Sequence, residues 1–375
     1  MGAKFQKFNM SFTLNLKKIF FDSIKAPNNF FQEGQIINYV DIGASNVKNL
    51  IFYSKFDFLN VFLFEPDQRA ITSYLSSKER NLNLKIFDKG LWKNKGKKYF
   101  YQFTNQASSS FFQPNLKKLS NYNLGVNLYH IEKKILSEVD SLDRLLINYN
   151  VDFIKLDTEG ADYEILLGAK KSLNQCLGIV IESQFFERYL NTKSFSEIEI
   201  LMRKKGFEIF MLNIEKWSQD NFYNIDTNIK NVWADVLYFI SIESLIKKLK
   251  KLTKKNLRVL LVKKIIFLMV MYKMHDSSLR YLKTIRREKL ITENEFIEVQ
   301  KFIKMNINSN FSIIIKDFFR LIICLILLPS ILIYTNKYIE LFKYCIEKNL
   351  RNFKRLVTFN LKNKSIFRNT GLDIH

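Results

Sequence analysis

Short apolar runs alternate with helix-compatible segments between residues 36 and 240. Apolar runs of this length are typical of parallel strands that helices cover on both faces. We predict strands at Ile36–Asp41, Asn60–Phe64, Leu82–Phe87, Asp152–Lys155, Gly178–Glu182, Glu208–Leu212 and Val236–Ile240. The predicted helices are Asn46–Lys55, Gln68–Ser77, Ser141–Tyr149, Asp162–Leu173 and Ser196–Lys205. The pattern therefore predicts an α/β fold with a doubly wound sheet.

The alternation weakens between Lys93 and Val139. A hairpin is predicted at Lys97–Phe103, and a long polar segment rich in Ser and Asn follows it. Long irregular segments in compact domains are usually lids, binding loops or disordered stretches. We interpret this segment as an acceptor loop, with simple looseness as an equal alternative.

After Ile240 the pattern becomes helical. Apolar residues from Ile242 to Leu252 recur at helical spacing while lysines fill the other faces, which predicts a basic amphipathic helix. Two strongly apolar runs follow, Val259–Tyr272 and Leu321–Tyr334. Each run would cover only about 21 Å as a helix, against about 30 Å of hydrocarbon, so neither alone predicts a transmembrane span. We divide the chain into an N-terminal extension at 1–35, an α/β domain at 36–240 and a basic, apolar-rich helical region at 241–375.

Charge separates the last two parts. Of the formal net charge of +23, residues 241–375 carry most, because they hold 28 Lys and Arg against 10 Asp and Glu. Such a region suits an anionic partner, and we interpret it as contacting an anionic membrane surface; the alternative is a helical domain that buries its own apolar runs. The three cysteines show no metal or redox spacing, and the first residues lack the features of a signal peptide. We expect a cytoplasmic protein, peripheral at the inner membrane face.

Acidic and small residues follow the first three predicted strands. Asp41-Ile-Gly-Ala ends the first, where Gly43 permits a sharp turn. Glu65 ends the second, where a carboxylate can accept both ribose hydroxyls, and Asp88 follows the third, where it could meet an adenine amino group. There is no Gly-x-Gly-x-x-Gly series for a pyrophosphate, so S-adenosylmethionine fits better than a dinucleotide. The predicted donor-binding set is Asp41, Gly43, Ala44, Glu65 and Asp88.

The densest acidic cluster follows the fourth predicted strand. Lys155, Asp157 and Glu159 lie where a parallel sheet would bring them beside the first strand, facing the donor. An acid there can align an acceptor hydroxyl or take its proton, with Asp157 the first choice of base and Glu159 the second. We interpret Asp162 and Glu164 as charges at a helix amino terminus. No His/Cys constellation indicates zinc and an acid pair alone does not establish magnesium, so no metal is predicted.

Seven motifs in this order resemble those of the FkbM-type methyltransferase family: Val40-Asp-Ile-Gly-Ala-Ser, Phe64-Glu-Pro-Asp, Val139-Asp-Ser-Leu-Asp, Ile154-Lys-Leu-Asp-Thr-Glu-Gly-Ala-Asp, Ile165-Leu-Leu-Gly-Ala, Val180-Ile-Glu-Ser and Ala234-Asp-Val-Leu-Tyr-Phe. The resemblance implies a class I, S-adenosylmethionine-dependent fold with a seven-stranded sheet, and O-methylation of sugars or polyketide-like hydroxyls. It also matches Lys155, Asp157 and Glu159 to the family's Lys-x-Asp-x-Glu-Gly segment, and Ser108–Ser110 to a Ser-rich stretch. Family members usually have glycine where Val47 stands.

Three functional hypotheses follow. The first is an O-methyltransferase that acts by direct displacement on a small-molecule or glycan hydroxyl, including a lipid-linked saccharide. The second is a donor-binding scaffold without activity, which Val47 keeps open because a β-branched residue is costly at a positive φ. The third is modification of RNA ribose. No two prolines adjoin and no cysteine follows a proline, so the motifs for base amino groups and pyrimidine rings are absent.

Overall fold

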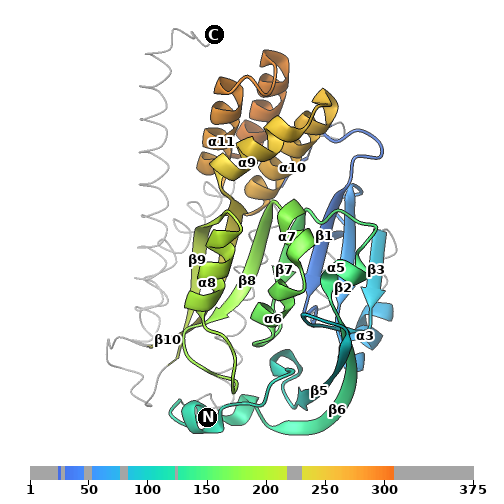
Figure 1. The fold of residues 1–375 in the computed structure, drawn as a ribbon, viewed down its shortest axis with the longest axis vertical. Coiled ribbons are helices and arrows are strands. Elements are labelled where there is room, and N and C mark those ends of the chain that lie inside the picture. Colours follow the sequence, from blue (N-terminus) through green and yellow to red (C-terminus); the bar gives the residue numbers. More distant parts are fainter. Residues whose placement is uncertain are drawn as a thin grey trace, which may run out of the picture. The chain divides into compact units, whose positions relative to one another are not determined.

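The computed structural model describes residues 24–26, 30–45, 53–76, 83–122, 126–217 and 230–307. Its main sheet has seven strands in the order β3-β2-β1-β7-β8-β10-β9 (Figure 1). Strands β1 to β3, β7 and β8 are parallel, and β10 runs antiparallel to both neighbours. This is the class I methyltransferase arrangement, and it confirms the predicted fold and all seven strands. Their bounds are Ile37–Ile42 (β1), Leu59–Phe64 (β2), Asn83–Phe87 (β3), Phe153–Leu156 (β7), Gly178–Gln184 (β8), Phe207–Trp217 (β9) and Lys230–Ile240 (β10).

Most predicted helices are present but several are shorter. The helices α3 (Gln68–Leu75) and α8 (Phe195–Lys204) match the predictions closely. The prediction of one helix over Asp162–Leu173 is wrong, because α6 (Asp162–Leu167) ends at Gly168 and α7 (Lys170–Gln175) begins after it. The Trp92 carbonyl passes so close to Gly168 that a Cβ there would lie 2.4 Å from it. The helix predicted from Ser141 ends early, as α5 (Leu142–Leu145), and Asn46–Lys55 falls mostly outside the described residues.

The segment between Lys93 and Val139 contains most of a second sheet. Its strands β4 (Gly90–Leu91), β5 (Gly96–Phe103) and β6 (Ile131–Asp140) have the order β4-β6-β5. The predicted hairpin within Lys97–Phe103 is wrong, since these residues form one strand that pairs with the distant β6. The chain between β5 and β6 contains η1 (Gln106–Ser108), α4 (Leu116–Leu119) and η2 (Val126–Leu128). Phe103, Leu119 and Tyr129 share a buried cluster with Tyr189 and Trp217, so their side chains have fixed positions.

Three helices follow the sheet: α9 (Ile242–Lys251), α10 (Lys255–Met271) and α11 (His275–Arg287). In α9 Leu245 and Leu249 are buried and most of the lysines are exposed, which confirms the amphipathic prediction. The apolar run Val259–Tyr272 forms most of α10 and packs against the sheet. There, the ring centroids of Tyr272 and Phe153 lie 5.1 Å apart, and Lys264 Nζ lies 2.7 Å from Asp152 Oδ2.

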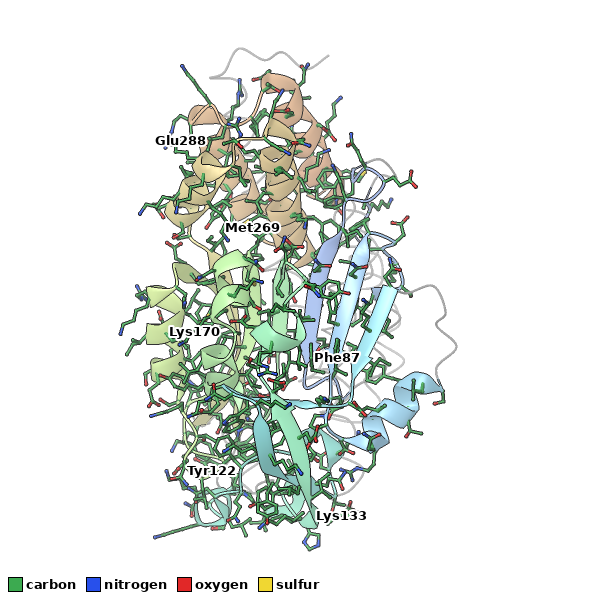
Figure 2. All side chains as sticks on the ribbon, turned by 45° about the vertical axis from the view of Figure 1, so that its right-hand side comes forward. Phe87, Tyr122, Lys133, Lys170, Met269 and Glu288 are labelled. Carbon is green, nitrogen blue, oxygen red and sulfur yellow. The ribbon has the colours of Figure 1, made fainter. Side chains whose placement is uncertain are left out.

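These helices contact the amino-terminal ends of the parallel strands. Asp152 directly precedes β7, and Lys248 donates to the carbonyls of Gln175 and Cys176, just before β8. Figure 2 shows Met269 of α10 beyond the end of the sheet that is opposite to Phe87, the last residue of β3. In Figure 1 the arrowheads of the parallel strands point away from α9–α11. Among the described residues no helix is long and apolar enough to cross a membrane. The run Leu321–Tyr334 lies outside the described residues.

The sheets and α9–α11 belong to one compact unit, which extends to Gln300, and the described residues 24–25 and 301–307 belong to a second. The secondary structure changes at residue 241 as predicted. The division of the chain into three domains stays a prediction.

Candidate functional site

The carboxyl ends of β1, β2, β3 and β7 lie along one edge of the sheet. The Gly43 N–H donates to the Phe64 carbonyl over 3.0 Å, and the Asp157 N–H donates to the Ile42 carbonyl over 3.0 Å. The Glu65 N–H reaches the Phe87 carbonyl over 3.1 Å. This edge therefore carries all the predicted site residues, and it is where open parallel sheets bind ligands.

Only glycine fits at position 43, because the loop after β7 passes directly against it. The φ of Gly43 is +77°, and a Cβ at this position would lie 1.8 Å from the Asp157 carbonyl oxygen. Ala44 follows it and is buried. The Asp-x-Gly-Ala motif thus lets the loop after β1 pass directly against the loop after β7, so the two halves of the site are in contact.

Asp41 is fully buried and holds Lys155. Its Oδ1 lies 3.1 Å from Lys155 Nζ, and its Oδ2 accepts a hydrogen bond from the Tyr53 hydroxyl over 2.6 Å. Lys155 Nζ also lies 3.5 Å from Asp157 Oδ2. Burial alone would lower the pKa of Lys155, but the Asp41 and Asp157 carboxylates raise it above its usual value, so the ammonium stays charged. The lysine joins the predicted donor side to the predicted acceptor side; direct donor contact by Asp41 stays a prediction.

Glu65 is a buried carboxylate that has no ion-pair partner in the described part of the chain. Its Oε1 accepts the Asp67 N–H over 2.8 Å, whereas the neighbouring Asp67 pairs with Arg69. Burial raises the pKa of Glu65 to about 8. A buried carboxylate of this kind is stabilised by hydroxyl donors, which a ribose diol supplies. Asp88 lies exposed in the turn after β3, beside the end of β2, and its adenine role stays a prediction.

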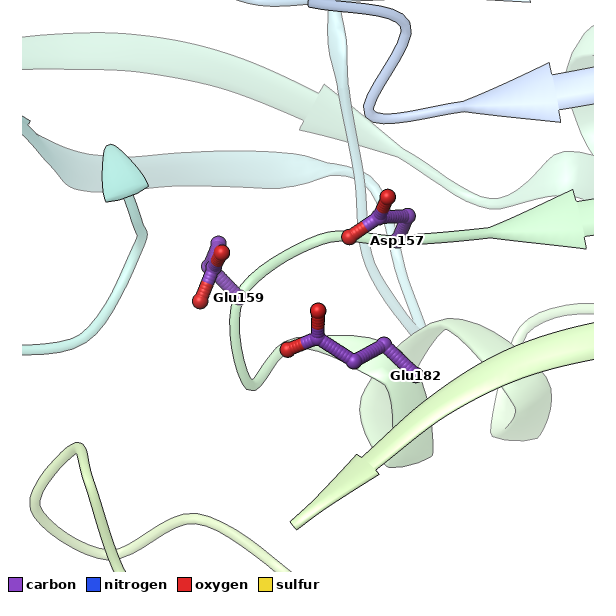
Figure 3. A group of neighbouring side chains, drawn as sticks. All are labelled: Asp157, Glu159 and Glu182. Atoms are coloured by element: carbon purple, nitrogen blue, oxygen red, sulfur yellow. The ribbon is translucent and has the colours of Figure 1, made fainter. Parts of the chain in front are cut away.

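Three carboxylates converge at the ends of β7 and β8. One carboxylate oxygen from each of Asp157, Glu159 and Glu182 lies within 4.8 Å of the other two, and Figure 3 shows the three groups close together at the ends of their strands. Burial raises the pKa of Glu159, and burial together with Glu159 raises that of Glu182 well above its usual value. The Asp157 side chain is 32% exposed and that of Glu159 is 13% exposed. Asp157 is therefore the most accessible of the three.

The loop that carries these acids is held from both sides. Asp162 accepts hydrogen bonds from the Thr158 hydroxyl, over 2.9 Å, and from the Gly160 N–H, over 3.2 Å. Asp162 thus lies in the first turn of α6, as predicted, but it also fixes the loop, and burial raises its pKa to about 7. Ser110, which is bridged to Tyr101 of β5, donates from its Oγ to the Glu159 carbonyl over 2.6 Å. The Ser-rich stretch thus contacts the acidic loop.

Arg188, Tyr189 and Glu182 belong to the site although the sequence interpretation did not select them. The Tyr189 hydroxyl donates to Glu159 Oε2 over 2.7 Å. Arg188 is 2% exposed, and its Nη2 lies 3.3 Å from Glu159 Oε2 and in closer contact with Glu182 Oε1. Glu182 had a sequence signal, because it stands in the Val180-Ile-Glu-Ser motif at a strand end. Arg188 and Tyr189 had none, since they follow the strand in a connecting segment without a motif.

Comparisons with known proteins identify a family for the part of the chain that contains this site. No curated protein matches the chain. Solved structures that match include precorrin-6y C5,15-methyltransferase from Geobacter metallireducens, with 9% identity and a TM-score of 0.30 over 60% of this chain and 88% of that one. Another is EvdMO1, with 8% identity and a TM-score of 0.30 over 63% of this chain and 49% of that one. Residues 41–209 match the family described as the methyltransferase FkbM domain, so these residues form a methyltransferase domain of that family, which implies S-adenosylmethionine as the donor.

Proposed function

We propose that this protein transfers a methyl group from S-adenosylmethionine to a hydroxyl group of a soluble saccharide. The observation that carries the proposal is the position of Asp157. Its carboxylate is partly exposed and lies 3.5 Å from Lys155 Nζ, and its own backbone carbonyl packs against Gly43. A base is thereby held beside the predicted donor loop, where an acceptor can reach it.

The residues support a direct displacement. S-adenosylmethionine supplies an electrophilic methyl group on a sulfonium centre. Asp157 accepts the proton of the acceptor hydroxyl as that oxygen forms its bond to the methyl carbon and the carbon–sulfur bond breaks. Lys155 pairs with the Asp157 carboxylate before transfer, with its Nζ 3.5 Å from Asp157 Oδ2, and Glu65 binds the ribose hydroxyls. The protein contributes mainly position and exclusion of water, since the donor is already activated.

Partly buried aromatic residues favour a saccharide over a small polar acceptor. Trp233, Phe186 and Phe112 are only partly buried and pack against the buried cluster that contains Phe103 and Trp217. The Trp233 ring also lies 4.3 Å from the guanidinium carbon of Arg188, so it borders the acidic cluster. Aromatic faces can cover the C–H face of a sugar ring while carboxylates bind its hydroxyls.

An anionic membrane surface is a separate partner that we propose for α9. Lys247, Lys251 and Lys254 are exposed on or beside this helix, whereas Leu245 and Leu249 are buried in the protein. Contact would therefore be electrostatic, at about 1 kcal/mol for each basic residue near the surface. Because α9 lies at the sheet edge opposite the acids, a membrane bound there would face away from Asp157. This geometry is why we propose a soluble saccharide rather than a lipid-linked one.

Charge reversal tests the membrane contact. The Lys247→Glu/Lys251→Glu/Lys254→Glu variant is expected to lose flotation with anionic vesicles, and neither protein should float with zwitterionic ones. A chain cut at residue 240 is an unsuitable comparison, because it would expose the sheet residues that α10 covers. Equal flotation of the variant and the unmodified protein with anionic vesicles would contradict this part of the proposal.

Methyl transfer is tested by incubating the full chain with donor and a panel of soluble saccharides, RNA and lipid-linked saccharides. We expect mass spectrometry to show the gain of one methylene unit on a soluble saccharide. Asp157→Asn should lower kcat by about 10²–10⁴ with unchanged donor affinity, as expected for loss of a general base. The matched control is Glu138→Gln, an exposed carboxylate. Donor binding without transfer to any acceptor would favour the inactive scaffold, and methylation of RNA alone would contradict the proposal.

A further inference from the structure

Arg188 is placed between two of the three converging carboxylates. Its Nη2 lies 3.3 Å from Glu159 Oε2 and also contacts Glu182 Oε1. The arginine is 2% exposed, so water screens neither contact well. A single guanidinium nitrogen therefore joins a carboxylate of the loop after β7 to one at the end of β8.

The surrounding residues hold the guanidinium in this place. Its Nη1 donates to the Tyr129 hydroxyl over 3.3 Å, and its carbon lies 4.3 Å from the centre of the Trp233 ring. The Arg188 backbone N–H donates to Gln184 Oε1 over 3.1 Å. Contacts to Tyr129, just before β6, and to Trp233 of β10 thus hold the side chain, and the contact to Gln184 of β8 holds its backbone, before any ligand binds.

Burial and mutual repulsion raise the pKa values of converging carboxylates such as Glu159 and Glu182, so they need a nearby cation to stay ionised. Proteins meet this need with a divalent ion or with a basic side chain. Three carboxylates on two adjacent segments could ligate such an ion, since hard cations prefer oxygen ligands. Here the arginine already stands between two of them, and its fixed donors suit carboxylates.

We propose that Arg188 is a positioning residue that serves as the resident cation of this cluster, in the place where a divalent metal ion would otherwise join Glu159 to Glu182. The two basic side chains of the site then have different roles. Lys155 pairs with Asp157, which remains accessible to the acceptor, while Arg188 fixes the two deeper carboxylates. The meaning for catalysis rests on the proposed function. The metal-binding property does not, because it can be measured without donor or acceptor.

Calorimetric titration of the full chain with Mn²⁺ tests this inference. The unmodified protein, Arg188→Lys and Glu182→Gln should all bind Mn²⁺ equally. Equal binding means that the cluster itself holds no Mn²⁺ in any of the three. Arg188→Met should gain a site that is about tenfold or more tighter than any in the unmodified protein, because affinity follows the number of charged ligands. The double variant Arg188→Met/Glu182→Gln should lose that gain, and Mn²⁺ should raise the Tm of Arg188→Met alone.

Binding of Mn²⁺ by the unmodified protein that Glu182→Gln abolishes would overturn the inference. A folded Arg188→Met protein, with an unchanged far-UV circular dichroism spectrum, that gains no Mn²⁺ site would also overturn it. If Arg188→Met does not fold, the comparison of the unmodified protein with Glu182→Gln and Arg188→Lys decides. Equal Mn²⁺ binding in these three supports a resident arginine. Loss of methyl transfer with intact Mn²⁺ results would concern the proposed function alone.

Discussion

The hydroxyl groups of Tyr272 and Tyr39 lie 3.2 Å apart and join the end of α10 to the first strand of the sheet. Tyr39 also hydrogen-bonds with Tyr53, whose hydroxyl donates to Asp41 over 2.6 Å. Asp41 in turn holds Lys155. A chain of hydrogen bonds and one ion pair therefore runs from the helical segment, along β1, to the candidate site. The helices after residue 240 are part of the support of that site.

Removing the Tyr272 hydroxyl should separate its hydrogen bond from its packing. Tyr272→Phe keeps the ring on Phe153 and should lower the free energy of unfolding by about 1 kcal/mol, whereas Tyr272→Ala should cost about 3–5 kcal/mol. Urea unfolding measures both. The control is Tyr99→Phe, whose side chain is largely exposed, and it should change little. An effect of Tyr272→Ala no larger than that of the control would show that α10 does not support the sheet.

Adding a methyl group at Gly43 should be far more damaging than adding one at Gly34. Both glycines have a positive φ, +77° and +78°, so Ala at either position costs about 1–2 kcal/mol from backbone strain. A Cβ at Gly43 would also meet the Asp157 carbonyl at 1.8 Å, while at Gly34 it would meet nothing within 4 Å. Thermal unfolding of Gly43→Ala and Gly34→Ala gives the comparison. Equal losses of Tm would mean that the two loops are not in contact.

The affinity for the donor or its demethylated product should rise with pH. The ionised form of Glu65 accepts ribose hydroxyls, and burial raises its pKa to about 8, so binding should tighten by up to about tenfold per pH unit below that value and level off above it. Stability has the opposite sign. Because the folded-state pKa is raised, the contribution of Glu65 is full below its ordinary pKa of 4.5 and is lost as the pH rises through about 8.

Calorimetry from pH 6 to pH 9 checks the affinity, and Glu65→Gln is the matched variant because it keeps the shape of the side chain. Glu65→Gln should bind more weakly at high pH and should lose the part of the pH dependence that belongs to this carboxylate. Identical pH profiles for the two proteins would remove Glu65 from the donor site.

Lys155 and Asp41 should show strong coupling. Lys155→Met removes the cation from a fully buried carboxylate and should cost about 3–5 kcal/mol of stability. Asp41→Asn combined with Lys155→Met should recover part of this loss, because no unpaired charge then remains. Urea unfolding of both single variants and the double variant gives a double-mutant cycle. Strictly additive losses would show that the 3.1 Å contact contributes no pairwise energy.

The sequence by itself determined the strands of the main sheet and the residues at their ends. Strands buried on both faces form continuous apolar runs, which can be recognised in the sequence without knowledge of the tertiary structure. The residues at the carboxyl end of a strand are next to it in the sequence. Asp41, Gly43, Glu65 and Asp157 could therefore be assigned to the carboxyl ends of the parallel strands. A helix break such as Gly168 was not visible, because its cause is the backbone of Trp92, far away in sequence.

Only the tertiary structure decided how distant segments pair. Strand β5 pairs with β6, although a long polar segment separates them in the chain. No sequence pattern in that segment indicates the pairing. The apolar sequence of α10 does not show whether the helix contacts a membrane or the sheet, because a helix buried in either has a similar composition. Arg188 meets Glu159 and Glu182 only because two adjacent parallel strands end together, and that contact depends on three-dimensional position rather than on any local pattern.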